Sequence, residues 1–358
     1  MIGFEARDLA GNYARPVGLY NYHIDRTLPV ISIISPSQNS NSNHPLFEYS
    51  LSEDIYYGKV LFFDQSDSLS LIPSVEFELD STEFSEGFHA LDTLVNQLPL
   101  NDSTIYTIQI KVYDIAKNWN DSTIIKDFHF DISPPIVNIF DPIDSSFINT
   151  NAVSIYKSED LISADMYWVN VEGNAVSSRI RERDMLSGET RLVMYPTSLN
   201  ENMHYDLFIV GEDLAGNPFQ TNMTKGIIYD VTAPVISINK PVEGGYINTK
   251  ALSYNFSEPL IQANVSWEIK TGIDTLSPYR VELQGEELSS GDHDSTFFSY
   301  VPELVDGSWY GLTMAGTDRA GNQSDVVIIN RAKYVESNKD ENSDIEKLWL
   351  EAKKDEIG

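Results

Sequence analysis

A five-residue pattern, Asp-x-Ala-x-Asn, occurs four times in this chain of 358 residues, and its spacing limits what the chain can fold into. The four copies begin at Asp8, Asp114, Asp213 and Asp318. They are separated by 106, 99 and 105 residues. Near-equal intervals of this length indicate a tandem array of domains of about 100 residues, each large enough to bury its own core.

Other residues recur at fixed offsets from the pattern. Seventeen residues after each of the first three pattern Asp residues stands a linker Asp, followed four residues later by Pro. These pairs are Asp25 and Pro29, Asp131 and Pro135, and Asp230 and Pro234. Each Pro precedes a short β-branched segment that ends at a second proline, Pro36, Pro142 or Pro241. The arrangement predicts a first strand with proline at both edges. Twenty-eight residues after each linker Asp comes a Ser-Glu pair: Ser52-Glu53, Ser158-Glu159 and Ser257-Glu258.

Two aromatic positions complete the repeat. Phe62, Trp168 or Trp267 stands nine residues after the Glu, and Tyr106, Tyr205 or Tyr310 stands eight residues before the pattern Asp. A buried aromatic on a middle strand and a tyrosine near the start of the penultimate strand are typical of immunoglobulin-like sandwiches. We expect the first aromatic between the sheets and the tyrosine hydroxyl bonded to the preceding turn, marked by Pro99, Pro196 and Pro302. Alternating polar and apolar residues over 106–113 favour a half-buried strand.

The predicted fold is all-β, with three complete immunoglobulin-like β-sandwiches in tandem, over residues 28–132, 133–231 and 232–336. Residues 1–27 are interpreted as the C-terminal hairpin of an incomplete repeat, because no tyrosine position precedes Asp8. We therefore expect a fragment of a longer protein. The opening MIGFEARDLAGN has neither a basic nor an apolar region, so a signal peptide is expected upstream.

Residues 337–358 are predicted to form a polar linker and a short amphipathic helix. Ser343 and Glu346 are spaced as a capping box. One helical face would carry Ile345, Leu348, Trp349 and Ala352. Two interpretations stay open: the helix packs on the last sandwich or continues into further sequence, or it docks a partner.

Three phrases carry a resemblance to a known family. They are Tyr-Asn-Phe-Ser-Glu-Pro (254–259), Gly-Glu-Asp-Leu-Ala-Gly-Asn (211–217) and Tyr-Asp-Val-Thr-Ala-Pro-Val-Ile-Ser-Ile (229–238). Over roughly residues 28–336 the chain resembles the bacterial immunoglobulin-like repeats of large secreted and cell-surface proteins. The first copy departs most, with Lys117 at the glycine position of the pattern and Phe62 in place of Trp. The resemblance implies an extracellular or cell-surface location.

The topology expected for such a sandwich groups the carboxylates. The loop with the Ser-Glu pair, the loop with the pattern Asp and the linker Asp should meet at the end where the first strand enters. The predicted groups are Asp25, Glu53 and Asp114; Asp131, Glu159 and Asp213; and Asp230, Glu258 and Asp318. Three adjacent negative charges are costly unless they are protonated or share a cation, and oxygen ligands suit Ca²⁺. The resemblance also implies calcium at such junctions.

A second interpretation of the same residues needs no metal. The pattern Asp can accept hydrogen bonds from its own turn, with Gly and Asn supplying positive φ. In that case Lys117 at the Gly position would cost on the order of 1 kcal/mol. The Ser-Glu pair would be a solvated turn, and the linker Asp would cap the bend before Pro. Both interpretations remain open at this point.

Composition excludes several functions. The chain has 24 Lys+Arg and 54 Asp+Glu, a net charge of −30, which disfavours nucleic acid and anionic lipid. No apolar run approaches the roughly 18 residues of a membrane span, and cysteine is absent. The histidines share no repeat position and match no catalytic motif; they are His23, His44, His89, His129, His204 and His293. No enzymatic activity is predicted.

We expect a structural or adhesion segment, a stalk or spacer, of an extracellular bacterial modular protein, monomeric within a longer chain. Its partner would be a protein or polysaccharide at a cell surface, and Trp119 and Trp309 lie outside the repeat pattern as candidates for ligand contact. The alternative is an accessory region of a secreted hydrolase that binds polysaccharide or only spaces a catalytic domain.

Overall fold

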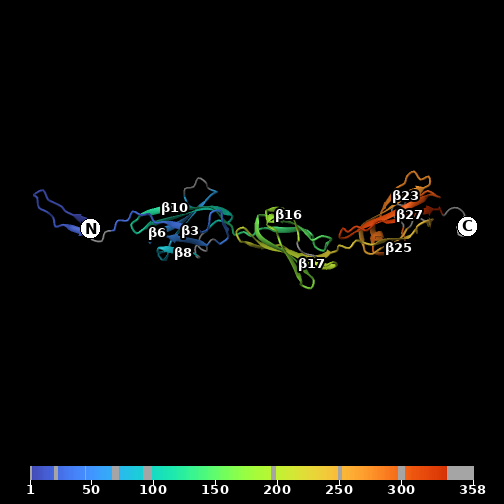
Figure 1. Ribbon diagram of the computed structural model, residues 1–358, viewed down its shortest axis with the longest axis horizontal. Helices are drawn as coiled ribbons and strands as arrows, with labels where there is room; N and C mark the ends of the chain where they lie inside the picture. Colours follow the sequence, from blue (N-terminus) through green and yellow to red (C-terminus); the bar gives the residue numbers. More distant parts are fainter. Residues whose placement is uncertain are drawn as a thin grey trace, which may run out of the picture.

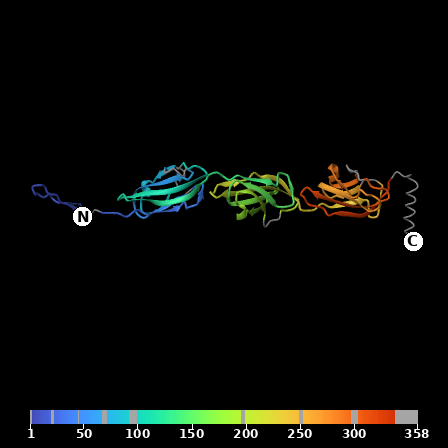
Figure 2. The ribbon, with the colours of Figure 1, turned by 90° about the horizontal axis from the view of Figure 1, so that it is seen from above.

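The computed structural model describes residues 2–19, 23–44, 46–66, 72–91, 99–194, 199–248, 252–296 and 303–336. Three β-sandwiches follow one another along the long axis, and an antiparallel hairpin lies at the N-terminal end (Figures 1 and 2). The hairpin consists of β1 (Ile2–Phe4) and β2 (Val17–Leu19). The helix predicted within residues 337–358 lies outside the described residues.

Each sandwich is built from the same succession of strands. The first contains β3 (Ile31–Ser35), β4 (Asn41–Ser42), β5 (Phe47–Leu51), β6 (Ile55–Asp64), β7 (Val75–Glu78), the 3₁₀ helix η1 (Ser81–Glu83), β8 (Gly87–Leu91), β9 (Thr104–Asp114) and β10 (Trp119–Phe130). The second contains β11 (Val137–Asp141), β12 (Phe147–Ile148), β13 (Ala152–Lys157), β14 (Leu161–Asn170), β15 (Ala175–Arg179), η2 (Glu182–Asp184), β16 (Gly188–Val193), β17 (Met203–Asp213), β18 (Pro218–Gln220) and β19 (Thr224–Tyr229). The third contains β20 (Ile236–Lys240), β21 (Tyr246–Ile247), β22 (Leu252–Phe256), β23 (Leu260–Thr271), β24 (Tyr279–Glu282), η3 (Gly285–Leu288), β25 (Gly291–Thr296), β26 (Trp309–Asp318) and β27 (Val327–Tyr334).

Two sheets face each other in every sandwich. The three-stranded sheets have the orders β3-β5-β8, β11-β13-β16 and β20-β22-β25. The larger sheets have the orders β4-β10-β9-β6-β7, β12-β19-β17-β14-β15 with β18 also on β17, and β21-β27-β26-β23-β24. All pairings are antiparallel except that of the short strand after each first strand, such as β4, which runs parallel to the last strand. The predicted fold class, tandem immunoglobulin-like sandwiches with an N-terminal hairpin, is confirmed.

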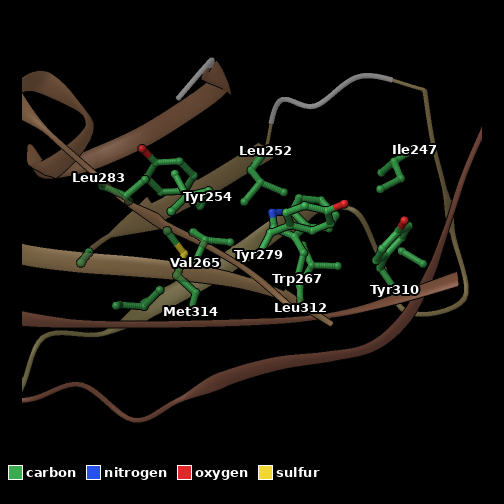
Figure 3. Packing of buried hydrophobic residues seen from close by; sticks show 14 of the residues in the cluster. Ile247, Leu252, Tyr254, Val265, Trp267, Tyr279, Leu283, Tyr310, Leu312 and Met314 are labelled. Atoms are coloured by element: carbon green, nitrogen blue, oxygen red, sulfur yellow. The ribbon is translucent and has the colours of Figure 1, made fainter. Parts of the chain in front are cut away.

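The cores are centred on the two predicted aromatic positions. Trp168 and Trp267 are fully buried and Phe62 is 2% exposed. Each packs edge-on against the tyrosine of its repeat at centroid distances of 6.0 to 6.5 Å, the favoured arrangement of aromatic pairs. Figure 3 shows this pair in the third sandwich, with Trp267 beside Tyr310.

The tyrosine hydroxyls also lie as predicted. Each accepts a 2.8 Å hydrogen bond from a backbone N–H five residues earlier. The donors are Asn101, Asn200 and Val305. Pro196 and Pro302 lie outside the described residues, whereas Pro99 directly precedes this segment in the first repeat.

The prediction that the histidines share no repeat position was wrong. His89 on β8 stacks on Tyr49, and His293 on β25 stacks on Tyr254, with ring centroids 5.1 and 4.6 Å apart. Both pairs are direct cross-strand neighbours. The equivalence is hidden in the sequence because the interval from the repeat Glu to the histidine is 36 residues in one copy and 35 in the other.

A buried lysine distinguishes the core of the second sandwich. Lys157 has no exposed surface, and its Nζ donates a 2.7 Å hydrogen bond to Thr190 Oγ1. Its register position, opposite the first strand, is occupied by Leu51 in the first sandwich and Phe256 in the third. Burial lowers the pKa of Lys157, and the nearby Asp184 and Asp160 offset this only in part.

Replacing this amine should therefore stabilise the second sandwich. We expect Lys157→Leu to raise its free energy of unfolding by about 1 kcal/mol or more, because the cost of desolvating the charge is removed. Denaturant unfolding measures the effect. Because the pKa of Lys157 is lower in the folded state, the charged amine reduces the stability of the fold at neutral pH. This loss of stability becomes smaller as the pH rises toward 10.5. The gain from Lys157→Leu should therefore shrink in alkaline buffer, and a loss of stability in the variant would contradict the interpretation.

Candidate functional site

One pole of each sandwich collects the predicted carboxylates. The turn before β6, β14 or β23 supplies the Glu, the turn after β9, β17 or β26 follows the pattern Asp, and the linker supplies the third group. In each of the three groups, one carboxylate oxygen per residue lies within 4.8 Å of the others. The groups are Asp25, Glu53 and Asp114; Asp131, Glu159 and Asp213; and Asp230, Glu258 and Asp318. The structure thus brings together all nine predicted residues.

The pattern Asp holds its own turn. Asp213 is 1% exposed, and its Oδ1 accepts hydrogen bonds from the backbone N–H groups of Ala215 and Asn217. Its Oδ2 accepts a 2.8 Å bond from Asn217 Nδ2. Asp114 and Asp318 are equally buried and make the same two bonds to their own Asn. The turn chemistry weighed as the metal-free interpretation is therefore present in every copy.

The pattern Asn connects this turn to the linker. Its amide group also donates to the backbone carbonyl of the linker Asp, over 3.3, 3.0 and 3.0 Å in successive repeats. The donors are Asn118, Asn217 and Asn322, and the acceptors are Asp25, Asp131 and Asp230. The expectation that this Asn supplies positive φ was wrong, because only the residue before it is left-handed. Its recurrence in all four copies was the signal for a side-chain role.

The serine of the Ser-Glu pair has the same hydrogen-bond partner in each repeat. The serine Oγ accepts a hydrogen bond of 2.8 to 2.9 Å from the N–H of the residue after the linker Pro: Val30, Ile136 or Val235. The linker Asp accepts from the N–H two residues later, that of Thr27, Ser133 or Thr232. The linker is thus tied to the following sandwich by the carbonyl of its Asp and by the start of the first strand, and the Asp side chain fixes the bend within the linker.

An additional acid, missed by the sequence reasoning, caps the segment that leaves each of the three sandwiches. Asp102 accepts the Ile132 N–H at 2.7 Å and the Ser133 hydroxyl. Glu201 accepts the Val231 N–H at 3.3 Å and the Thr232 hydroxyl. Asp306 accepts the Glu336 N–H at 3.0 Å. All three stand four residues before the repeat tyrosine, so the signal was available at a fixed offset.

Neighbouring sandwiches also touch directly, with different contacts at the two junctions. Between the first and second, the N–H of Asn43 donates a 2.9 Å hydrogen bond to the carbonyl of Ala215, inside the pattern turn. Between the second and third, the Arg319 guanidinium lies 5.5 Å from the Phe147 ring centre, within reach of a cation–π interaction. The pattern turn therefore forms part of both junctions.

Burial, and after it the clustered charges, raise the pKa of the central acids. Burial raises the pKa of Glu258, and the carboxylates of Asp230, Asp318 and Glu201 raise it further. The pKa of Glu159 is raised in the same order, by burial and then by Asp131 and Asp213. Burial raises the pKa of Asp230 as well. In the first group the pKa of Glu53 is raised by burial and by Asp25, Asp114 and Glu86. Without a cation, these clusters are sites of net repulsion.

The donor set fits a hard cation. All the grouped side chains are carboxylates, without a nitrogen or sulfur ligand, and the glutamates are half-buried. A carboxylate offers about four lone-pair positions, and Asp213 uses three of them within its turn. Oxygen atoms therefore remain for a cation. Ca²⁺ accepts six to eight oxygen ligands in flexible geometry, which such loop-borne groups can supply in part.

The candidate ligand-contact tryptophans differ in setting. Trp119 on β10 is 49% exposed, with the Lys111 ammonium 4.6 Å from its ring centre. Trp309 on β26 is half-buried and lies beside Arg331, Lys333 and Tyr246. Neither tryptophan is a member of the three clusters of carboxylates.

The geometry defines a string of immunoglobulin-like sandwiches with acidic junctions. Residues 189–336 match the family model described as "Bacterial Ig-like domain (group 3)", which confirms the resemblance over the third sandwich and part of the second. No curated protein matches the chain. Within the described residues, no helix is long and apolar enough to cross a membrane.

Similar solved structures are remote in sequence. A tetra-tandem repeat from the extending region of a large adhesion protein is 16% identical, with coverage of 90% of this chain and 79% of that chain and a TM-score of 0.27. A structure from a 1.5-MDa bacterial ice-binding adhesin is 11% identical, with coverage of 87% and 100% and a TM-score of 0.31. The FN1–FN3 domains of chicken CNTN1 are 12% identical, with coverage of 85% and 97% and a TM-score of 0.30.

The pattern turn gives a reciprocal stability prediction. The residue before the Asn has φ of 91° at Gly216 and 69° at Lys117, so lysine occupies a left-handed position. We expect Lys117→Gly to stabilise the first sandwich and Gly216→Lys to destabilise the second, each by about 1 kcal/mol. A Cβ at Gly216 would meet no atom closer than 3.7 Å, so the effect is one of backbone conformation. Equal stability of Gly216→Lys and the original chain in urea unfolding would contradict the prediction that lysine is disfavoured at this left-handed position.

The raised carboxylate pKa values predict an acid-stabilised metal-free protein. A carboxylate whose pKa is higher in the folded state binds more protons when folded, so stability rises as the pH falls through that pKa toward 4.5. Melting in EDTA should therefore show a rising midpoint on mild acidification. Glu258→Gln should reduce the slope, whereas Glu282→Gln, on an exposed strand position of the same sandwich, should leave it unchanged. Identical slopes in Glu258→Gln and the original chain would refute the repulsion.

Proposed function

We propose that this chain is a non-catalytic spacer segment of an extracellular modular protein, and that calcium at the sandwich junctions holds the spacer extended. The observation that carries this proposal is the recurrence of three convergent carboxylates at the entry to each sandwich. Other supports are the tandem architecture and the match of residues 189–336 to a bacterial immunoglobulin-like domain.

The cation would act on the linker through groups of this chain. Glu159 belongs to the second sandwich, Asp131 to the linker, and Asp213 to the pattern turn that touches the first sandwich through Asn43. Asp102 of the first sandwich holds the next residue of the same linker. A cation bound by the three grouped carboxylates would neutralise their repulsion and restrain the linker against the turn. Bending at the junction would then require loss of those bonds.

Stiffness is the property that such a joint supplies. Six-residue linkers with Pro at the strand entry already limit bending. The net charge of −30 favours extension at low salt, and this contribution is screened within about 8 Å at physiological ionic strength. Local cation binding at the junctions would preserve the extended form where long-range repulsion is weak.

A thermal melt in EDTA, calcium or magnesium tests the proposal on the full chain. With calcium at 100 times the dissociation constant, a site should contribute about 2.7 kcal/mol to stability. Glu159→Gln should lose part of this gain, because the variant removes a ligand charge and leaves the bonds of Asp213 in place. Asp165→Asn, on the outer face of β14, is the matched control and should respond to calcium like the original chain.

Small-angle scattering then tests the link from binding to shape. Calcium should narrow the distribution of overall lengths, and Glu159→Gln should broaden it again at the same calcium concentration. Absence of a calcium-specific shift in both melting and scattering would sink the calcium-stiffened spacer and leave flexible linkers between sandwiches.

A further inference from the structure

The outer face of the larger sheet in the third sandwich is hollowed. The hollow has a volume of about 260 Å³ and lies over β23, β24, β26 and β27. Polar groups from all four strands line it, among them Ser266, Glu268, Arg280, Thr313 and Asn330. It faces away from the aromatic core of Figure 3, since Trp267 and Leu312 alternate with Ser266 and Thr313 along their strands.

Small residues at two paired positions produce the hollow. Ser266 on β23 lies opposite Thr313 on β26. In the second sandwich the equivalent pair is Tyr167 and Phe208, whose rings stack at 5.2 Å with an interplanar angle of 8°. In the first sandwich it is Leu61 and Gln109. The same backbone therefore accepts bulky side chains here, and the third copy lacks them.

A glycine extends the floor of the hollow. Gly311 stands next to Leu312 on β26, where the second sandwich has Asp206 and the first has Thr107. A Cβ at Gly311 would lie 2.5 Å from Lys270 Cε and 3.0 Å from the carbonyl oxygen of Asn330. The absence of a side chain lets Lys270 lie across the strand, beside its ion-pair partner Glu268.

The lining of the hollow offers hydrogen-bond donors and acceptors suited to a sugar. It also carries a positive charge, that of Arg280, for which the described residues show no salt bridge. Ser266 and Thr313 supply hydroxyl groups. Asn330 supplies an amide, whose Nδ2 also donates over 3.4 Å to Glu243 Oε2. Lys270 is neutralised by Glu268. Arg280 is exposed and forms no salt bridge within the described part of the chain. Its guanidinium can bind a carboxylate through two parallel hydrogen bonds.

We propose that this hollow binds a carboxylate-bearing sugar residue of an acidic polysaccharide. Arg280 binds the carboxylate, and the hydroxyl and amide groups of the floor bind the ring hydroxyls. Contact with a short glycan segment is governed by these local charges, because the distant acidic residues are screened beyond about 8 Å at physiological salt. The inference does not depend on calcium, since no residue of the hollow belongs to a carboxylate cluster.

The test measures binding of alginate oligosaccharides, a polyuronate, to the full chain by calorimetry in calcium-free buffer. The decisive variant is Ser266→Tyr/Thr313→Phe, which introduces the pair that the second sandwich already accommodates. We expect its affinity to fall at least tenfold with an unchanged melting temperature. Arg280→Ser, the residue type of Ser177 at the equivalent position, should also weaken binding at least tenfold.

The matched control replaces the bulky pair at the equivalent position of the second sandwich by small residues. Tyr167→Ser/Phe208→Thr should bind alginate as the original chain does. Failure of the original chain to bind, or undiminished binding by the filled variant, would overturn the proposal. Equal affinity for neutral dextran would exclude the role of the carboxylate, and equal affinity for polyglutamate would exclude a sugar-specific site.

Discussion

The junctions of this chain depend on the hydrogen bonds that a buried carboxylate accepts at the turn before the last strand. Asp213 and its equivalents accept the N–H groups of their own turn and the side chain of the pattern Asn. The same amide holds the carbonyl of the linker Asp. A turn within one sandwich is thereby coupled to the segment that enters it, and the five-residue pattern encodes a joint as well as a turn.

That coupling explains why acidic residues accumulate where repulsion disfavours them. The linker Asp must accept the N–H two residues on, the glutamate stands beside a serine that caps the entering strand, and the preceding sandwich adds another acid. The aspartates and Glu201 have local roles as hydrogen-bond acceptors, yet burial, and after it their charges, raise the pKa of Glu258. Turn chemistry and cation binding are thus compatible, because the hydrogen-bonded atoms position the oxygen atoms that remain.

Fixed offsets made the fold and the carboxylate groups predictable, because the segment between linker Asp and Glu has one length in all three copies. The buried Trp168 and the tyrosine hydroxyl bonds followed from the same regularity. Features that follow the segments of variable length were not predicted. The shared position of His89 and His293 is one example, because its distance in sequence from the repeat Glu differs by one residue between the two copies. The role of the Asn amide also escaped, since a side chain that bridges two segments about 90 residues apart requires their relative placement. The hollow over Ser266 depends on small residues at positions of two neighbouring strands, β23 and β26, and no single sequence pattern shows that combination.

Counting the calcium ions bound per chain tests the central claim, that the grouped carboxylates form cation sites, most directly. Isothermal titration of the metal-free full chain should give three saturable calcium sites, one for each carboxylate group. Glu159→Gln/Glu258→Gln should weaken two of them and leave the third unchanged. Absence of saturable binding, or a stoichiometry that these substitutions do not alter, would contradict the claim and reduce the clusters to hydrogen-bonded turns.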